Sequence, residues 1–128
     1  MTAKQALQEI KEKCEANPYV EVCGFLGYDK NSGKFVVSHE ENIAEDPRLQ
    51  FMINPLNYIL FKEDFALVAI YHSHISEDES PSEFDVKMSN NCCEPFLIYS
   101  LRTKKNHIYE PQNVDLDVNT LEKVKEQL

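Results

Sequence analysis

The stretch that decides the fold is Phe65-Ala66-Leu67-Val68-Ala69-Ile70-Tyr71-His72-Ser73-His74, a long apolar run that ends on two histidines. A run of this composition is typical of a strand that is buried on both faces of a sheet. We therefore predict that residues 65–72 form the central strand of a sheet. Side chains two apart on a strand point to the same face, so His72 and His74 project together while Ser73 points the other way.

The rest of the chain alternates helical and strand patterns around this segment. Residues 2–16 and 56–63 carry apolar side chains at helical spacing, Asn54-Pro55 is a typical helix start, and residues 80–83 combine a capping box with an early proline. This order predicts an α/β fold, a single-domain mixed β-sheet flanked by helices, over residues 1–128. In chain order we expect a helix over 2–16, strands over 19–28, 34–39 and 49–53, a helix from 54 to about 63, the strand over 65–72, a helix from 82 to about 90, strands over 95–102 and 107–110, and a helix over 117–128 capped by Asp117 or Asn119.

Composition and charge exclude several classes of protein. Of the 128 residues, 13 are Lys or Arg and 22 are Asp or Glu, which gives a net charge of −9. Binding to a phosphate backbone needs a basic face, so we expect no nucleic-acid partner. The apolar runs are too short to span a membrane, and residues 1–13 lack the apolar core of a signal peptide. The four cysteines lack a paired zinc-type spacing, which favours reduced thiols in a reducing compartment.

The two histidines are the first members of a candidate zinc site. Asp85 follows His74 by eleven residues and lies in the first turns of the helix that begins near Ser82. The intervening loop is long enough for the helix to fold back, so Asp85 can reach a metal between His72 and His74. Zinc prefers imidazole nitrogens and carboxylate oxygens in a tetrahedron, and catalytic sites use three protein ligands and leave one position open. We therefore expect one Zn²⁺ held by His72, His74 and Asp85.

A hydrolytic site also needs a group that accepts a proton from water. Glu21 is a lone acid in an apolar segment, and a buried carboxylate without a partner would be costly without a purpose. We predict that Glu21 is the general base. Ser82, three residues before Asp85, could donate a hydrogen bond to an oxyanion.

Less specific interpretations of these residues stay open. A His-x-His pair can decorate a surface, Glu21 can be polarity at the edge of a strand, and Ser82 can be a helix cap alone or in addition. We expect His39 and His107 to be solvated or structural. The acidic run 77–79 is either a solvated loop or a segment that influences the choice of substrate.

At these residues the sequence resembles the JAMM/MPN+ (JAB domain) zinc metalloprotease family. The pattern of that family is a Glu in an early strand, then His-Ser/Thr-His-Pro, seven residues, Ser, two residues and Asp, which Glu21, His72-Ser73-His74, Ser82 and Asp85 match. The resemblance implies a cytidine-deaminase-like MPN/JAB fold, zinc on the two histidines and the aspartate, Glu21 as general base and Ser82 as oxyanion stabiliser. Ile75 replaces the usual Pro, and we expect the loop over 75–79 to be more mobile for that reason.

A closer resemblance is to the prokaryotic and phage branch of the family. Residues 42–47 and 51–55 look like the stretch that precedes the His-x-His strand in the N-terminal domain of the phage tail assembly protein K type. Those proteins often carry a cysteine peptidase domain downstream, so the chain is either a stand-alone version or an excised domain. This resemblance implies a protein or peptide substrate, phage tail components as possible partners, and a cytoplasmic or virion-associated location.

The function that these patterns predict is that of a zinc metallopeptidase, which hydrolyses a peptide or isopeptide bond with metal-activated water. Phage tail assembly or penetration of the host cell is the expected setting. Two alternatives stay open: an MPN-type scaffold or interaction module without catalysis, and a bacterial protease that processes isopeptides or sulfur carriers. Retention of all five polar residues, Glu21, His72, His74, Ser82 and Asp85, favours the enzyme.

Overall fold

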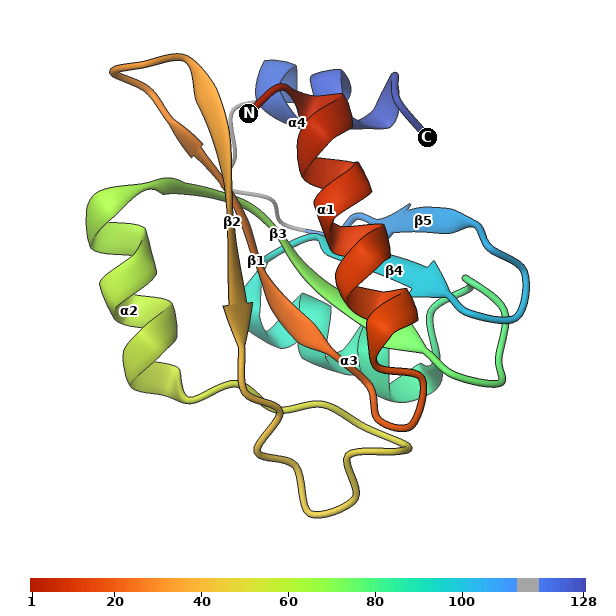
Figure 1. The fold of residues 1–128 in the computed structure, drawn as a ribbon. Coiled ribbons are helices and arrows are strands. Elements are labelled where there is room, and N and C mark those ends of the chain that lie inside the picture. The colour runs from red at the N-terminus through yellow and green to blue at the C-terminus, as the bar shows by residue number, and fades with distance from the viewer. Residues whose placement is uncertain (113–117) are drawn as a thin grey trace.

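The strand β3 (Ala66–His74) lies at the centre of the structure, a computed structural model that describes residues 1–112 and 118–128 (Figure 1). It pairs antiparallel with β1 (Cys23–Asp29) and parallel with β4 (Phe96–Ser100). With β2 (Lys34–Glu40) and β5 (Asn106–Tyr109), these strands form a mixed five-stranded sheet in the order β2-β1-β3-β4-β5. The predicted central strand is therefore confirmed, and it extends through His74.

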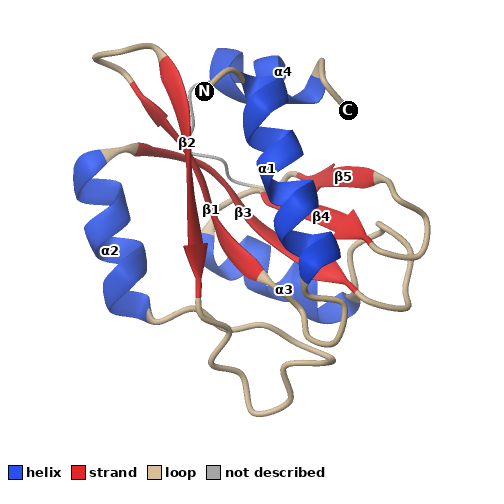
Figure 2. Ribbon diagram, viewed as in Figure 1, coloured by secondary structure: helices blue, strands red, loops and turns tan. Residues whose placement is uncertain are grey.

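Helices cover both faces of this sheet (Figure 2). The helices α1 (Ala3–Ala16) and α4 (Val118–Lys125) pack on one face, where Tyr71 joins the larger apolar cluster. The helices α2 (Pro55–Asp64) and α3 (Glu83–Cys92) lie on the other face, where Ile70 belongs to a second cluster with Phe25 and Phe96. Because side chains alternate along a strand, His72 lies on the same face as Ile70. The predicted α/β fold, a mixed sheet flanked by helices, is confirmed.

One predicted strand, over residues 49–53, is wrong. The segment belongs to an irregular loop between β2 and α2. Its backbone groups bond locally: the N–H groups of Leu49 and Gln50 donate to the carbonyl of Asp46 at 3.1 Å, and the N–H of Met52 donates to the side chain of Asn42 at 3.1 Å. Phe51 is nevertheless buried, because its ring packs against the sheet. The apolar composition of this segment therefore reflects the burial of Phe51 and not the pairing of a strand.

Several boundaries also differ from the predicted ones. The first strand begins at Cys23 and not at residue 19, so Glu21 lies just before β1, and Tyr19 is exposed. The predicted C-terminal helix over 117–128 is observed as α4. Asp117 lies outside the described residues, and Asn119 lies within α4 and not at its cap.

The helix α2 presents an unexpected face to the sheet. Its apolar residues at helical spacing, Leu56, Ile59 and Leu60, are all exposed. Instead, Tyr58 and Phe61 pack on Phe25, with ring centroids 6.3 and 5.0 Å apart. Helical spacing therefore predicted the existence of α2 but not the face that it buries.

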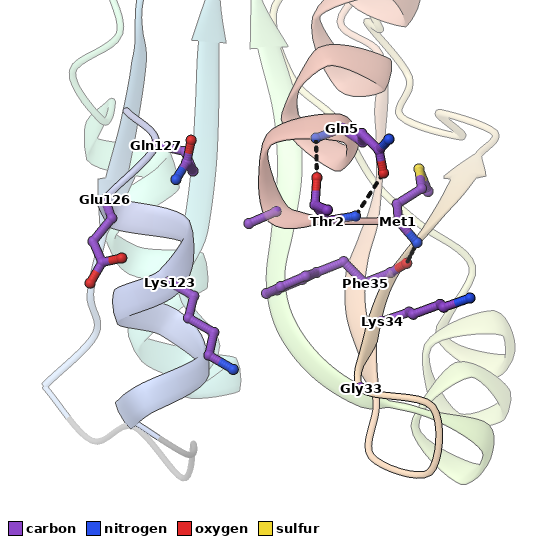
Figure 3. A pocket seen from close by; sticks show the side chains of 10 residues that line it. Met1, Thr2, Gln5, Gly33, Lys34, Phe35, Lys123, Glu126 and Gln127 are labelled. Carbon is purple, nitrogen blue, oxygen red and sulfur yellow. Dashed lines mark hydrogen bonds between the residues drawn. The ribbon is translucent and has the colours of Figure 1, made fainter.

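A cavity of about 470 Å³ lies between the start of α1, β2 and α4, on the opposite face of the sheet from His72 (Figure 3). The polar groups of Thr2 and Gln5 beside it bond to each other in the capping box of α1. The N–H of Phe35 donates to the carbonyl of Met1 at 2.8 Å. This cavity therefore adjoins the chain ends and not the histidine pair. None of the described helices is long and apolar enough to cross a membrane.

The surroundings of Gly24 on β1 show how closely β1 approaches β2 and β3. A Cβ atom at this position would overlap the backbone oxygen of Ser38 and lie 3.0 Å from the ring of Tyr71. We expect Gly24→Ala to lower the free energy of unfolding by about 1–3 kcal/mol, because a backbone atom of β2 must move. Chemical denaturation measures this change. The matched variant Ser32→Ala, in the exposed turn after β1, should change stability by less than about 0.5 kcal/mol. Equal stability of Gly24→Ala and the wild type would contradict the close approach of β1 and β2.

Candidate metal centre

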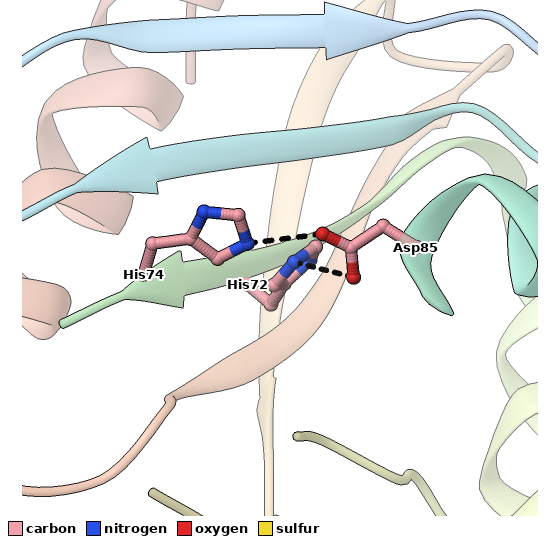
Figure 4. A group of neighbouring side chains, drawn as sticks. All are labelled: His72, His74 and Asp85. Atoms are coloured by element: carbon pink, nitrogen blue, oxygen red, sulfur yellow. Dashed lines mark hydrogen bonds and ion pairs between the residues drawn. The ribbon is translucent and has the colours of Figure 1, made fainter. Parts of the chain in front are cut away.

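The end of β3 and the start of α3 bring three side chains together (Figure 4). The Nε2 atom of His72 lies 3.1 Å from one carboxylate oxygen of Asp85, and the Nε2 atom of His74 lies 2.9 Å from the other. All three side chains are buried. Each offers a donor atom, and the three donors lie within 4.8 Å of one another. The structure thus places the three predicted ligands side by side.

The helix start determines where Asp85 points. The hydroxyl oxygen of Ser82 accepts a hydrogen bond from the N–H of Asp85 at 3.0 Å, and the N–H of Ser82 donates to the Asp85 carboxylate at 3.0 Å. This reciprocal pair is a capping box at the N-terminus of α3. The same carboxylate oxygen also faces His74. The helix cap therefore holds the carboxylate in position beside both histidines.

The two histidines differ in their outer contacts. The Nδ1 atom of His74 lies 2.7 Å from the carbonyl oxygen of Asp78, so an N–H there donates to that carbonyl. This bond makes Nε2 the ring nitrogen of His74 that would bind a metal, as in many metal-binding histidines. His72 stacks on Phe51 with ring centroids 4.3 Å apart.

The ring nitrogens of His72 provide a test of whether a metal fits. Among the buried side-chain nitrogen and oxygen atoms of the described residues, only these two have no hydrogen-bond partner. The Asp85 oxygen is close to Nε2 but does not meet the geometry of a hydrogen bond. A buried polar atom without a partner is costly, and a metal on Nε2 would remove this cost. The donor set of two imidazoles and a carboxylate fits zinc.

Burial and mutual attraction shift the pKa values of these groups in opposite directions. Burial would raise the pKa of Asp85, but the two histidines and the helix cap hold it well below its usual range. Burial lowers the pKa of His72. Burial would also lower the pKa of His74, but Asp85 and the Asp78 carbonyl raise it to about 9. Asp85 is therefore the anionic member of the group.

Glu21, just before β1, lies beside this group and contributes a carboxylate near His74. Its carboxylate forms a second cluster with His74 and Glu77, whose donor atoms also lie within 4.8 Å of one another. Glu21 is only 3% exposed, and burial raises the pKa of its carboxyl group to about 8, although attraction to His74 opposes the shift. A carboxylate with this pKa can accept and release a proton near neutral pH.

Two side chains that the sequence did not single out hold the backbone around Glu21. The hydroxyl of Ser73 accepts a hydrogen bond from the N–H of Val22 at 2.9 Å, on the side of β3 away from the histidines. The side-chain amide of Asn42 donates to the carbonyl of Glu21 at 2.8 Å and to that of Gln50 at 3.0 Å. Its oxygen accepts from the N–H groups of Ala44 and Met52. Asn42 thus connects the loop before α2 to the candidate base. A single loop Asn gives no signal of this role in the sequence.

The loop after His74 is held by several hydrogen bonds. The Asp78 carbonyl bonds to His74, the hydroxyl of Ser100 donates to the carbonyl of Glu77 at 2.6 Å, and Thr103 donates to Glu79 at 2.7 Å. These bonds tie the loop to the end of β3 and to the segment after β4, and the expectation that Ile75 makes the loop more mobile stays a prediction. Glu77 remains 52% exposed and marks the side on which solvent reaches the group.

The other two histidines lie apart from the centre, whereas Cys23 on β1 is the cross-strand neighbour of His72 on β3. His39 contacts Tyr71 and Glu9 on the face of α1, at 2.5 and 3.2 Å, and His107 is exposed on β5. The thiol of Cys23 donates weakly to the carbonyl of Glu40, and burial raises its pKa to about 12. The contacts of His39 and the exposure of His107 agree with the structural or solvated roles predicted for these two histidines.

Comparison with known proteins identifies relatives of the chain. A family model described as prokaryotic homologs of the JAB domain matches residues 3–114. Among curated proteins, none matches the sequence. The solution structure of a protein from Desulfitobacterium hafniense is similar, with a TM-score of 0.65 and 19% identity over 88% of this chain and 89% of that chain. A protein from Salinibacter ruber, also solved in solution, has a TM-score of 0.49 and 16% identity over 87% and 88%. The first of these likenesses shows a shared fold.

The metal centre makes a direct prediction about zinc. We expect the purified chain to bind one Zn²⁺, measured by elemental analysis and by titration of the metal-free protein. His72→Ala and Asp85→Ala should each weaken binding by more than the roughly 10- to 100-fold that is typical of losing an outer partner of a ligand. His107→Ala, which removes an exposed histidine, should leave binding unchanged. Full zinc binding by Asp85→Ala would contradict the assignment of this centre.

Asn42 makes a prediction about stability. Asn42→Asp keeps the acceptor oxygen but replaces the donating amide with a carboxylate that faces the carbonyls of Glu21 and Gln50. We expect a loss of about 1–3 kcal/mol in the free energy of unfolding, because those carbonyls lose their donor. The same change at Asn57, which is exposed near the start of α2, should be neutral or slightly stabilising. Thermal and chemical denaturation of both variants tests this difference.

Proposed function

The chain belongs to the family of prokaryotic homologues of the JAB domain, and we propose that it acts as a zinc-dependent metallopeptidase that hydrolyses a peptide or isopeptide bond. One observation carries the proposal: a buried His72–His74–Asp85 group lies next to Glu21, a carboxyl group whose pKa is raised to about 8. A site that only stabilised the fold would not need a proton acceptor beside three ligands. Perturbed carboxyl groups of this kind cluster at catalytic sites.

The roles of the residues follow from their positions. His72, His74 and Asp85 would hold the metal, and three protein ligands leave a position free, as catalytic zinc sites do. When bound there, zinc would act as a Lewis acid that polarises the substrate carbonyl and lowers the pKa of water. The exposed side chain of Glu77 marks the side from which the substrate approaches.

Glu21 carries the proton in the proposed reaction. Its carboxylate accepts a proton from the attacking water as the oxygen forms a bond to the carbonyl carbon. It returns this proton to the nitrogen of the leaving amine as the C–N bond breaks. Burial makes the Glu21 carboxylate more basic than an exposed one by raising its pKa, which favours acceptance of the proton.

Ser82 combines two functions in this proposal. Its oxygen accepts a hydrogen bond from the N–H of Asp85, so its own hydrogen remains available to donate. Donation to the oxyanion of the tetrahedral intermediate would stabilise negative charge as it develops. The helix cap and the oxyanion donor are therefore compatible in one side chain.

The setting of the reaction rests on the resemblance to the phage tail assembly protein K type. The segments that carry this resemblance, residues 42–47 and 51–55, form the loop that holds Glu21 and covers His72. We propose a protein or peptide substrate, phage tail components as partners, residues 1–128 as a single JAB domain and a cytoplasmic or virion-associated location. The alternatives are a scaffold of the same fold without catalysis and a bacterial protease for isopeptides or sulfur carriers. Zinc binding without turnover would favour the scaffold.

Glu21→Gln tests the proposed mechanism. The variant is nearly isosteric and should keep zinc, since Glu21 is not among the three ligands. It should lower turnover of a mixed peptide library by about 100- to 10,000-fold, because the amide cannot accept the proton. Mass spectrometry of the library measures cleavage, and elemental analysis measures zinc in the same samples. Full turnover by Glu21→Gln, or loss of its zinc, would show that the role assigned to Glu21 is wrong.

A further inference from the structure

A cavity of about 250 Å³ lies on the same face of the sheet as the metal centre. It is enclosed by the sheet, the loop before α2, α2 itself and α3. Most of its lining side chains are apolar, and they include Phe25, Phe51, Met52, Ile70, Met88 and Phe96. Local sequence patterns could not predict this cavity, because its walls come from segments that are far apart in the chain.

The cavity and the metal centre share walls. The ring of Phe51 lines the cavity and stacks on His72 at 4.3 Å, and the ring of Phe96 lines it and meets His72 edge-on at 5.6 Å. Ile70 lies two residues before His72 on the same face of β3, a separation of about 7 Å. Two residues of an extended peptide span a similar distance. A peptide with its scissile bond at the centre can therefore place a neighbouring side chain at the cavity.

Two methionines form the exposed rim of the cavity. Met52 is 50% exposed and follows Phe51, and Met88 is 37% exposed and lies one helical turn after Asp85. Methionine side chains are flexible and polarizable, and they are common on surfaces that bind apolar groups of varied shape. The rim is thus apolar and adaptable on the sides that lie nearest to the metal centre.

The polar group on the cavity wall is already engaged. The hydroxyl of Tyr58 donates to the carboxylate of Glu94, and the amine of Lys62 lies 2.9 Å from the same carboxylate. Tyr58 therefore presents its ring to the cavity and offers no free donor to a polar ligand. A polar side chain placed here would lose its bonds to water without replacement.

We propose that this cavity binds one apolar side chain, aliphatic or aromatic, of the peptide substrate, within two residues of the bond that is cleaved. The term substrate rests on the function proposed above. The volume is below the roughly 300–1,000 Å³ of sites for whole small molecules, which favours a single side chain as the occupant. An apolar pocket of this kind distinguishes side chains by roughly 10- to 200-fold.

Methionine resonances provide the test of binding. The chain has three methionines: Met52 and Met88 lie at the cavity, and Met1 lies at the cavity on the opposite face. The zinc-loaded Glu21→Gln protein, labelled with ¹³C in the methionine methyl groups, is titrated with N-acetyl-glycyl-leucyl-glycinamide. We expect saturable shifts of the Met52 and Met88 signals and none of Met1. The glutaminyl analogue should bind at least about 10-fold more weakly. Equal effects of the two peptides, or no saturable shift, would overturn the proposal.

A pair of variants links this binding to the cavity. Cys92→Phe places a ring in the cavity from its wall, whereas Ile59→Phe places the same ring on the exposed side of α2. We expect Cys92→Phe to weaken binding of the leucyl peptide at least about 10-fold, and Ile59→Phe to leave it unchanged. Unchanged binding by a folded Cys92→Phe protein would overturn the proposal. If this variant does not fold, the comparison of the two peptides on the parent protein decides.

Cleavage of a peptide library by the zinc-loaded wild-type chain separates this proposal from the proposed function. Preferred cleavage within two residues of an apolar side chain supports both. Cleavage without such a preference overturns the assignment of the cavity and leaves the peptidase function in place. Saturable binding of the leucyl peptide without cleavage of any library member supports the cavity as a binding site and counts against the peptidase.

Discussion

The carboxylate of Asp85 is the constraint on which the site depends. One of its oxygens faces His72, and the other faces His74 and accepts the N–H of Ser82. A single group thus closes the first turn of α3 and joins that helix to the end of β3. Two buried imidazoles and a buried carboxylate would each be costly alone. The attraction of both histidines and the bonds of the helix cap stabilise the carboxylate, and the low pKa of Asp85 reflects them. The ring nitrogens of His72 still lack a hydrogen-bond partner.

Because side chains alternate along β3, its two faces carry residues with different roles. His72 and His74 face α3, while Ser73 between them faces away and binds the backbone of Val22. Residues on both faces of the strand are therefore needed for one centre. His72 and His74 supply candidate ligand atoms, and Ser73 binds the neighbouring segment that carries Glu21. Asn42 holds the same segment from the loop side. The centre is positioned by backbone contacts of the central sheet and not by its polar side chains alone.

Much of this architecture could be predicted from local patterns. The apolar run of residues 65–71 predicted the central strand, and residues 80–83 predicted a helix start, because these features act within a few residues. The predicted capping box over residues 80–83 is wrong by two positions, since it forms between Ser82 and Asp85 and Pro81 precedes it. The spacing of His72, His74 and Asp85 predicted that they would meet, and they do. The failures involve contacts across the fold. The segment 49–53 is apolar because Phe51 covers His72 and Phe96, and not because it pairs as a strand. The face that α2 buries depends on Phe25, which lies far away in the sequence. The hydrogen bonds of Asn42 and the apolar cavity likewise depend on contacts between segments that are far apart in the sequence.

The long separation between Glu21 and the histidines has a consequence for the order in which the protein matures. His74 and Asp85 are eleven residues apart, so the ligands can gather in a newly made chain after one short loop closes. The bond that fixes the segment of Glu21 joins residues 51 positions apart and forms only when β1 has paired with β3. Contacts of such sequence separation form slowly. A chain in which the three candidate ligands have met but the sheet is incomplete would lack Glu21 beside them. In the peptidase proposed above, the unfinished molecule would therefore be unable to cleave itself or its neighbours.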